Sequence, residues 1–261
     1  MGLVRKQMRF HILIIGLATI ATVGGSSPSE VEADHSWSGY HWKRGSGGPV
    51  TIPLDDNMGP TWDQLLPTVN EDWTVDAAYA DVLDTIVAPG RSDPERCRAV
   101  AGRVEVCSGS YGQTEWLGIA TIWTEGKHIV QATVKMNDDL FDQVLNSSAA
   151  AKRRVLCQEV GHALGLGHGY TSPSCMDDQH VLADPTYVAP SDHDHAALAN
   201  VFDHVHRRRT PRVNAASFSA SESTPPDPLR TLRRGNEAVT MIVDDLGGGR
   251  KRISFVHWEL P

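Results

Sequence analysis

Apolar side chains recur along the chain with two spacings, and each spacing predicts one kind of element. A spacing of three or four residues is that of a helix with one buried face, and it occurs at 60–73, from the N-cap Ser147 to Gly165, and from Ser191 to 205. Alternation of apolar and polar residues predicts strands, at 50–54, 82–87, 116–123, 128–136, 238–243 and 253–258. Because helices and strands are mixed, we expect an α+β fold with a mixed twisted sheet.

Two prolines interrupt these patterns. Pro53 lacks the backbone N–H that the interior of a sheet needs, so we expect the strand at 50–54 to lie at a sheet edge or to contain a bulge. Pro67 lies inside the helix expected at 60–73, where it predicts a kink or a break.

The N-terminus has the pattern of an export signal. A basic start over residues 5–9 precedes an apolar run from Ile12 to Gly25, which is about 14 residues long. A membrane-spanning helix needs about 20 apolar residues, so this run is short for a span. We therefore expect residues 1–33 to be a signal peptide cleaved after Ala33, which makes the protein secreted and extracellular. An uncleaved anchor is the alternative.

The remaining chain divides by composition. Residues 34–208 hold most of the helix and strand patterns and form the expected main domain. Residues 209–229 are rich in serine and proline, which predicts a disordered linker. Residues 230–261 contain the terminal hairpin. Because an isolated hairpin is marginally stable, we expect it to dock on the main domain or on another surface.

Composition and charge narrow the class of partner. The chain has 261 residues, of which 40% are hydrophobic and 21% charged, as in one domain of moderate size with appendages. The formal net charge of −8 argues against nucleic acid as a partner. After signal cleavage no other stretch is long enough to cross a bilayer, so no membrane contact is expected. The four cysteines fit an exported protein.

The stretch CQEVGHALGLGH carries the most specific chemistry of the chain. Positions four apart on a helix share one face, so Gln158 and His162 point the same way, with Glu159 beside them. Gly165 can adopt the left-handed conformation that ends a helix and turns the chain, which lets His168 approach from outside the helix. Imidazoles and a carboxylate gathered in this way predict a metal-dependent catalytic site.

The stretch resembles the zinc-binding pattern HExxHxxGxxH of the metzincin metalloproteases, and most nearly that of matrixin-like secreted bacterial proteins. Gln158 stands in place of the first histidine. Metzincins also carry a methionine in a tight turn under the zinc, and Met176 fits that position. The resemblance covers about Gly48 to Val205 and implies a zincin-like metalloprotease domain over residues 34–208, with an active-site helix and a C-terminal helix.

The resemblance implies a secreted zinc metalloendopeptidase that hydrolyses protein or peptide substrates. We expect the protein to be a monomer. Glu159 would be the general base, and His162 and His168 would be zinc ligands. In this family the strand ahead of the zinc helix borders the cleft and pairs with the substrate backbone, which here is the strand at 128–136.

Two positions depart from the family pattern. Gln158 offers only a neutral amide oxygen, which is a poorer third zinc ligand than imidazole. An oxygen ligand would favour another divalent metal as the alternative to zinc. Some family members have a tyrosine two residues after the methionine, where this chain has Asp178. The alternative function is therefore that of a catalytically inactive pseudoprotease, which binds a peptide or protein without cutting it.

The cysteines allow three pairings, of which we favour Cys97 with Cys107 and Cys157 with Cys175. The first pair would staple a hairpin or loop. The second would tie the helix of the motif to the methionine turn, and closing a loop of that size contributes about 3 kcal/mol. The stretch around Cys97, PERCR, partly matches the PRCGxPD pattern of matrixin propeptides, in which a cysteine binds the zinc. A zinc-capping thiol is therefore the alternative role of Cys97.

Other polar residues receive ordinary assignments. Asn137–Asp139 could bind structural calcium, but we expect a polar turn. Ser191 with Asp194 forms a capping-box-like start to the last helix. The remaining histidines considered as metal ligands are instead expected to be polar residues of an N-terminal arm or exposed residues of the last helix: His35, His41, His193, His195, His204 and His206.

Overall fold

The computed structural model describes residues 35–44, 48–74, 82–112, 114–144, 148–202 and 239–258. All of them belong to one compact unit, Val31–Pro261. The expected signal peptide at 1–33 and linker at 209–229 lie outside the described residues, as do His204 and His206.

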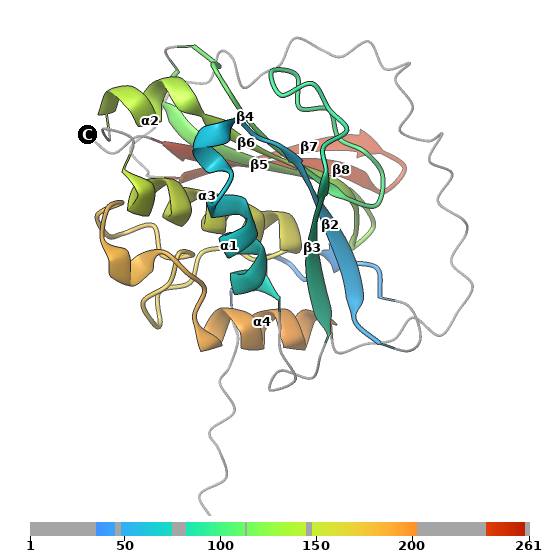
Figure 1. Ribbon diagram of the computed structural model, residues 1–261. Coiled ribbons are helices and arrows are strands. Elements are labelled where there is room, and N and C mark those ends of the chain that lie inside the picture. The colour runs from blue at the N-terminus through green and yellow to red at the C-terminus, as the bar shows by residue number, and fades with distance from the viewer. Residues whose placement is uncertain are drawn as a thin grey trace, which may run out of the picture. The chain divides into compact units, whose positions relative to one another are not determined.

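The strands form one eight-stranded mixed sheet in the order β3–β2–β4–β6–β5–β8–β7, and β1 also pairs with β6 (Figure 1). Strands β1, β2, β3, β4 and β6 run parallel, whereas β5, β7 and β8 add antiparallel pairs at one side. The strands are β1 His41–Trp42, β2 Val50–Asn57, β3 Leu83–Pro89, β4 Val104–Gly109, β5 Trp116–Glu125, β6 His128–Asn137, β7 Val239–Gly247 and β8 Arg250–Trp258. This mixed α/β architecture agrees with the expected α+β class.

Four α-helices accompany the sheet in the described residues: α1 Leu65–Trp73, α2 Asp138–Val144, α3 Ala149–Leu164 and α4 Asp192–Phe202. Two short 3-10 helices lie at Pro60–Trp62 and Pro185–Tyr187. Helix α3 packs against β5 and β6, and α1 packs against α3 and β3 (Figure 1). The main apolar core forms between these helices and the sheet. None of the helices in the described part of the chain is long and apolar enough to cross a membrane.

Helix α3 begins and ends close to where its sequence predicts. The hydroxyl of Ser148, one residue beyond the expected cap, accepts a hydrogen bond from the backbone N–H of Ala151. Gly165 ends the helix with φ 114°. A Cβ atom at this glycine would lie 2.2 Å from the carbonyl oxygen of Tyr40. Glycine therefore both turns the chain and lets the N-terminal arm, residues 35–44, pass the end of α3.

Both expectations based on proline need correction. Strand β2 lies between β3 and β4, so the edge position expected from Pro53 is wrong. Pairing with β4 begins only at Leu54, so Pro53 lies in the half of β2 that pairs with β3 alone. Pro67 is the third residue of α1, where its missing N–H has no partner within the helix. The break falls ahead of Leu65 instead.

The terminal hairpin forms where the sequence predicts it, and it docks on the sheet. Strand β8 pairs antiparallel with β5 over its whole length, and β7 pairs with β8. A second, smaller apolar cluster holds Trp116 and Ile119 of β5 against Val256 and Trp258 of β8. The hairpin is thus built into the sheet rather than appended to it.

Candidate active site on helix α3

Three side chains of the motif lie in the core, at the C-terminal half of α3. Gln158 and Glu159 are 0% exposed and His162 is 1% exposed. Gly118 of β5 lies directly under them, since a Cβ atom there would be 2.9 Å from Cγ of Glu159. A glycine at this point of β5 therefore makes room for the carboxylate between helix and sheet.

The two expected histidine ligands come together. The rings of His162 and His168 lie 4.8 Å apart, centroid to centroid, in an edge-to-face arrangement. His162 donates from Nδ1 to the carbonyl oxygen of Leu166 at 2.9 Å, and His168 Nδ1 lies 3.6 Å from Oδ2 of Asp178. Both Nε2 atoms are buried without a hydrogen-bond partner among the described residues. An acceptor at Nδ1 keeps the proton there, so each Nε2 keeps its lone pair.

The charges at this site are strongly disfavoured by burial. Burial raises the pKa of Glu159 well above its usual value, and the backbone N–H of Ala120 only partly offsets this. Neither Glu159 oxygen makes a hydrogen bond of ordinary geometry with the described residues. Burial lowers the pKa of His162 well below its usual value, and the nearby His168 lowers it further. Burial also lowers the pKa of His168, against the opposing effect of Asp178.

Gln158 contacts a residue that the sequence analysis did not connect with the site. His257 of β8 donates from Nδ1 to Oε1 of Gln158, and the same nitrogen lies 3.9 Å from Oε1 of Glu159. Nε2 of Gln158 has no hydrogen-bond partner among the described residues. The amide oxygen that would serve as the third metal ligand is therefore engaged by the hairpin. No local pattern around His257 indicates this contact.

Strand β8 covers the site because of its register on β5. His257 lies opposite Gly118, and Phe255 lies opposite Ala120. Directly opposed residues of an antiparallel pair point to the same face, so both side chains extend over small residues toward α3. The ring of Phe255 stacks on that of His162 at 4.2 Å with an interplanar angle of 6°. Small residues on β5 and large ones on β8 thus close the space above the helix.

The expectation that the strand at 128–136 borders the substrate cleft is wrong. Strand β6, which contains 128–136, lies between β4 and β5 and offers no free edge there. Beyond β6 lies β5, whose second edge is occupied by β8, and β7 is the outer strand on this side.

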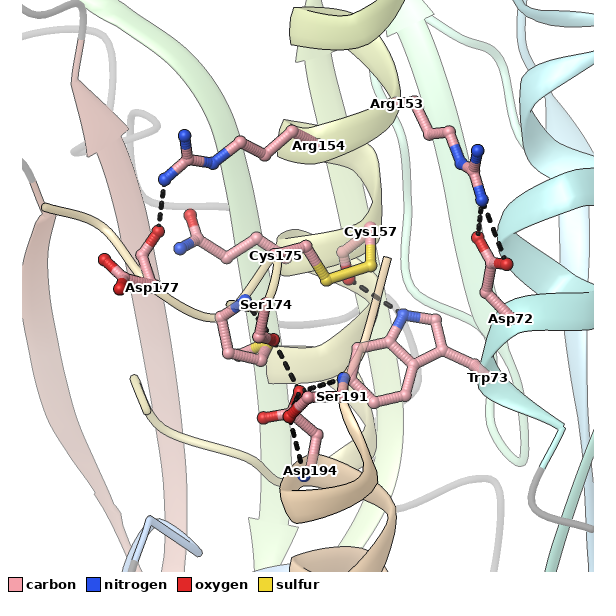
Figure 2. The surroundings of a disulfide bond; sticks show 12 residues. Asp72, Trp73, Arg153, Arg154, Cys157, Ser174, Cys175, Asp177, Ser191 and Asp194 are labelled. Atoms are coloured by element: carbon pink, nitrogen blue, oxygen red, sulfur yellow. Dashed lines mark hydrogen bonds and ion pairs between the residues drawn. A yellow bond between two sulfur atoms is a disulfide. The ribbon is translucent and has the colours of Figure 1, made fainter. Parts of the chain in front are cut away.

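The segment after the motif is tied firmly to α3 (Figure 2). Both expected disulfides form, Cys97–Cys107 and Cys157–Cys175, and all four cysteines are therefore paired. Next to the second one, Trp73 donates to the carbonyl of Cys157, and Arg154 donates to that of Asp177. Met176 lies under the helix, since a Cβ atom at Gly161 would be 2.5 Å from its sulfur. The methionine turn is thus fixed beside His162.

A second histidine group lies outside the motif. Ligand atoms of His35, His193 and Asp194 all lie within 4.8 Å of one another, so this buried group could hold a metal ion. Among the described residues, no third His, Cys, Asp or Glu completes such a set with His162 and His168. The expectation that His193 is exposed is wrong, because only 8% of it is accessible. His195 stacks on Trp73 instead of lying free on the helix.

The possible calcium site at Asn137–Asp139 and a cavity of the structure both lie away from the motif residues. Asn137, Asp138 and Asp139 form the end of β6 and the start of α2 rather than a simple turn. The two aspartates accept hydrogen bonds from Trp62, Ser110 and Gly112. A cavity of about 470 Å³ is lined by residues of β1, β2 and the start of β6, including Trp42, Ile52 and His128, and by none of the motif residues.

Comparison with known proteins gives no assignment. No protein-family model matches the chain, and no curated protein matches it.

Proposed function

We propose that the chain is a secreted, zinc-dependent endopeptidase of the zincin-like, metzincin kind, whose C-terminal hairpin closes its active site. The observation that carries this proposal is the set of buried polar atoms at α3 that lack partners. Nε2 of His162, Nε2 of His168 and both oxygens of Glu159 belong to this set. Leaving such groups unsatisfied costs free energy, which a bound cation and water would recover.

The donor set fits zinc at two positions. His162 and His168 would hold the ion through Nε2, and the oxygen of Gln158 is the third donor that the motif provides. Bound there, zinc would supply the Lewis acidity that activates water and polarises a peptide carbonyl. Glu159 would take a proton from the water and return it to the leaving amine. Asp178 and the Leu166 carbonyl orient the two imidazoles through their Nδ1 atoms.

Closure by β8 acts on this chemistry in two ways. An extended peptide that adds to β5 needs the edge that β8 occupies, so substrate and hairpin compete for the same backbone groups. Burial, to which His257 of the hairpin contributes, also raises the pKa of Glu159, and a protonated carboxyl cannot act as a base. Separation of β8 from β5 would relieve both effects.

The pseudoprotease remains the second candidate, and two observations favour it. Gln158 replaces an imidazole, and its oxygen is engaged by His257. A scaffold that binds without cutting needs neither zinc nor an open β5 edge.

Metal content and peptidase activity separate the two candidates. We expect the mature chain to bind zinc that both His162→Ala and His168→Ala remove, and to cleave unfolded protein in a chelator-sensitive manner. Phe255→Ala, which removes the ring over His162, should increase cleavage. Val256→Ala is the matched control, since Val256 packs in the apolar cluster on the other face of the sheet. The peptidase proposal would be refuted if neither histidine variant lost zinc and the Phe255→Ala protein did not cleave.

A disulfide between β5 and β8 tests the closure itself. Thr121 and Ser254 are directly opposed, and their hydroxyl oxygens lie 2.9 Å apart. The Thr121→Cys/Ser254→Cys protein should form a cross-link and lose cleavage while keeping its zinc. Each single variant serves as control. Undiminished cleavage by the cross-linked protein would show that β8 does not block the substrate.

A further inference from the structure

The carboxylate of Asp194 is held in place through one of its oxygens, and its other oxygen faces His35. Oδ2 accepts hydrogen bonds from the hydroxyl of Ser174 at 2.5 Å, from the backbone N–H of Ser191 at 2.6 Å and from its hydroxyl at 2.8 Å (Figure 2). Oδ1 lies 3.0 Å from Nε2 of His35. Outer hydrogen bonds of this kind orient a carboxylate that binds a metal.

His35 is positioned as firmly as the aspartate, although it lies in the N-terminal arm. Its carbonyl oxygen accepts from the backbone N–H of Gly167 at 2.7 Å. Its ring lies over Gly169, where a Cβ atom would be 3.0 Å from the ring. The ring also stacks on that of His193, with centroids 4.7 Å apart. Two imidazoles and one carboxylate therefore meet in a small buried space.

We propose that His35, His193 and Asp194 bind one divalent metal ion, forming a second metal centre separate from the α3 site. Two nitrogen donors and one carboxylate oxygen suit zinc or a similar borderline ion. The two imidazoles and Oδ1 would be the donors, and the proton that His35 Nε2 shares with Asp194 would leave on binding.

The position of this centre assigns it a structural role. His35 belongs to the N-terminal arm, whereas His193 and Asp194 belong to the first turn of α4. Ser174, which bonds Asp194, precedes Cys175 of the disulfide to α3. One ion would thus join the arm, α4 and the methionine turn. Because the ion binds only the folded chain, it should raise the unfolding temperature.

The test is a metal titration of the full, metal-free chain with zinc, measured by calorimetry and by elemental analysis after gel filtration. We expect two zinc ions per wild-type chain if both centres bind, and one fewer in His193→Ala and in His35→Ala. His195→Ala is the matched control, since it removes another histidine of α4 that stacks on Trp73 outside the group. It should bind as many ions as the wild type. Circular dichroism checks that each variant is folded.

The outcomes separate this centre from the peptidase. Loss of one ion in His193→Ala and in His35→Ala supports the second centre, whether His162→Ala also loses an ion or the α3 site is empty in every variant. Unchanged zinc content and unchanged thermal stabilisation by zinc in both folded variants would overturn it and leave the α3 site unaffected. If only one variant fails to fold, the other decides.

Discussion

The α3 site and the His35–His193–Asp194 group differ in how their carboxylates are satisfied. At α3, the two imidazole Nε2 atoms and the Glu159 oxygens are buried without partners among the described residues. At the second group, the carboxylate already accepts hydrogen bonds from Ser174 and Ser191 and contacts His35. The buried carboxylate of Glu159 is therefore costly in its charged form unless a cation is bound, whereas that of Asp194 is already stabilised by hydrogen bonds without one.

This difference separates two uses of a metal. A catalytic site must keep reactive groups free of protein partners, because substrate and water have to take their place. A structural site gains from partners that fix its donors before the ion arrives. Removing side chains from each group in turn therefore tests whether the two sites really differ in purpose.

The largest effect is expected from Glu159→Gln. The amide has nearly the same shape but cannot accept a proton, so cleavage should fall by about 10²–10⁴-fold. The measurement is initial-rate cleavage in the Phe255→Ala background, where β8 is loosened. Zinc content at both groups should stay unchanged. Equal rates with glutamate and glutamine would remove the general base from the mechanism.

Loss of the Cys157–Cys175 disulfide should affect both groups together. Cys157 precedes Gln158 in α3, and Cys175 follows Ser174, which bonds Asp194. Replacing both cysteines by alanine should lower the free energy of unfolding by about 3 kcal/mol. Urea denaturation measures this loss, and zinc titration should show weaker binding at both centres. The Cys97→Ala/Cys107→Ala protein is the comparison, since its disulfide touches neither group.

The α3 site could be predicted from sequence because its geometry is local. The spacing of Gln158, Glu159 and His162 places them on one helix surface whatever surrounds the helix, and Gly165 supplies the turn to His168. The contact of His257 with Gln158 depends instead on the register of β8 on β5. Register is set by pairing between distant segments, so no local pattern predicts it.

The burial of the second histidine group cannot be predicted from local sequence for a related reason. His193 lies in the first turn of a helix whose neighbouring residues are charged, a pattern typical of a solvated surface. Burial arises because the N-terminal arm crosses the end of α3 at Gly165 and brings His35 onto α4. Similarly, Pro53 predicts an edge strand, although β2 lies inside the sheet. The local sequence does not reveal that pairing with β4 begins at the next residue, Leu54.

A smaller effect is expected from Ser174→Ala, which separates the two groups sharply. The hydroxyl of Ser174 donates to Asp194 and accepts from the backbone N–H of Met176. Without it the carboxylate loses an orienting bond, and zinc affinity at the second centre should fall by about 10–100-fold. Affinity at the α3 site should change little. Equal weakening at both centres, measured by competition with a chelator, would mean that they form one coupled unit.

The last expected effect concerns pH and the metal-free chain. Burial lowers the pKa of His257 from 6.5 to about 3, so the folded chain keeps this imidazole neutral while the unfolded chain protonates it. Its contribution to stability is complete above pH 6.5 and is lost as the pH falls toward 3. His257→Asn keeps a donor for Gln158 but cannot titrate. It should therefore reduce the slope of unfolding free energy against pH by up to about 1.4 kcal/mol per pH unit in this window.

Urea denaturation at several pH values measures the slope, with His195→Asn as control. An unchanged slope would show that β8 does not hold His257 buried in solution, and the closure of the α3 site would then lose its support.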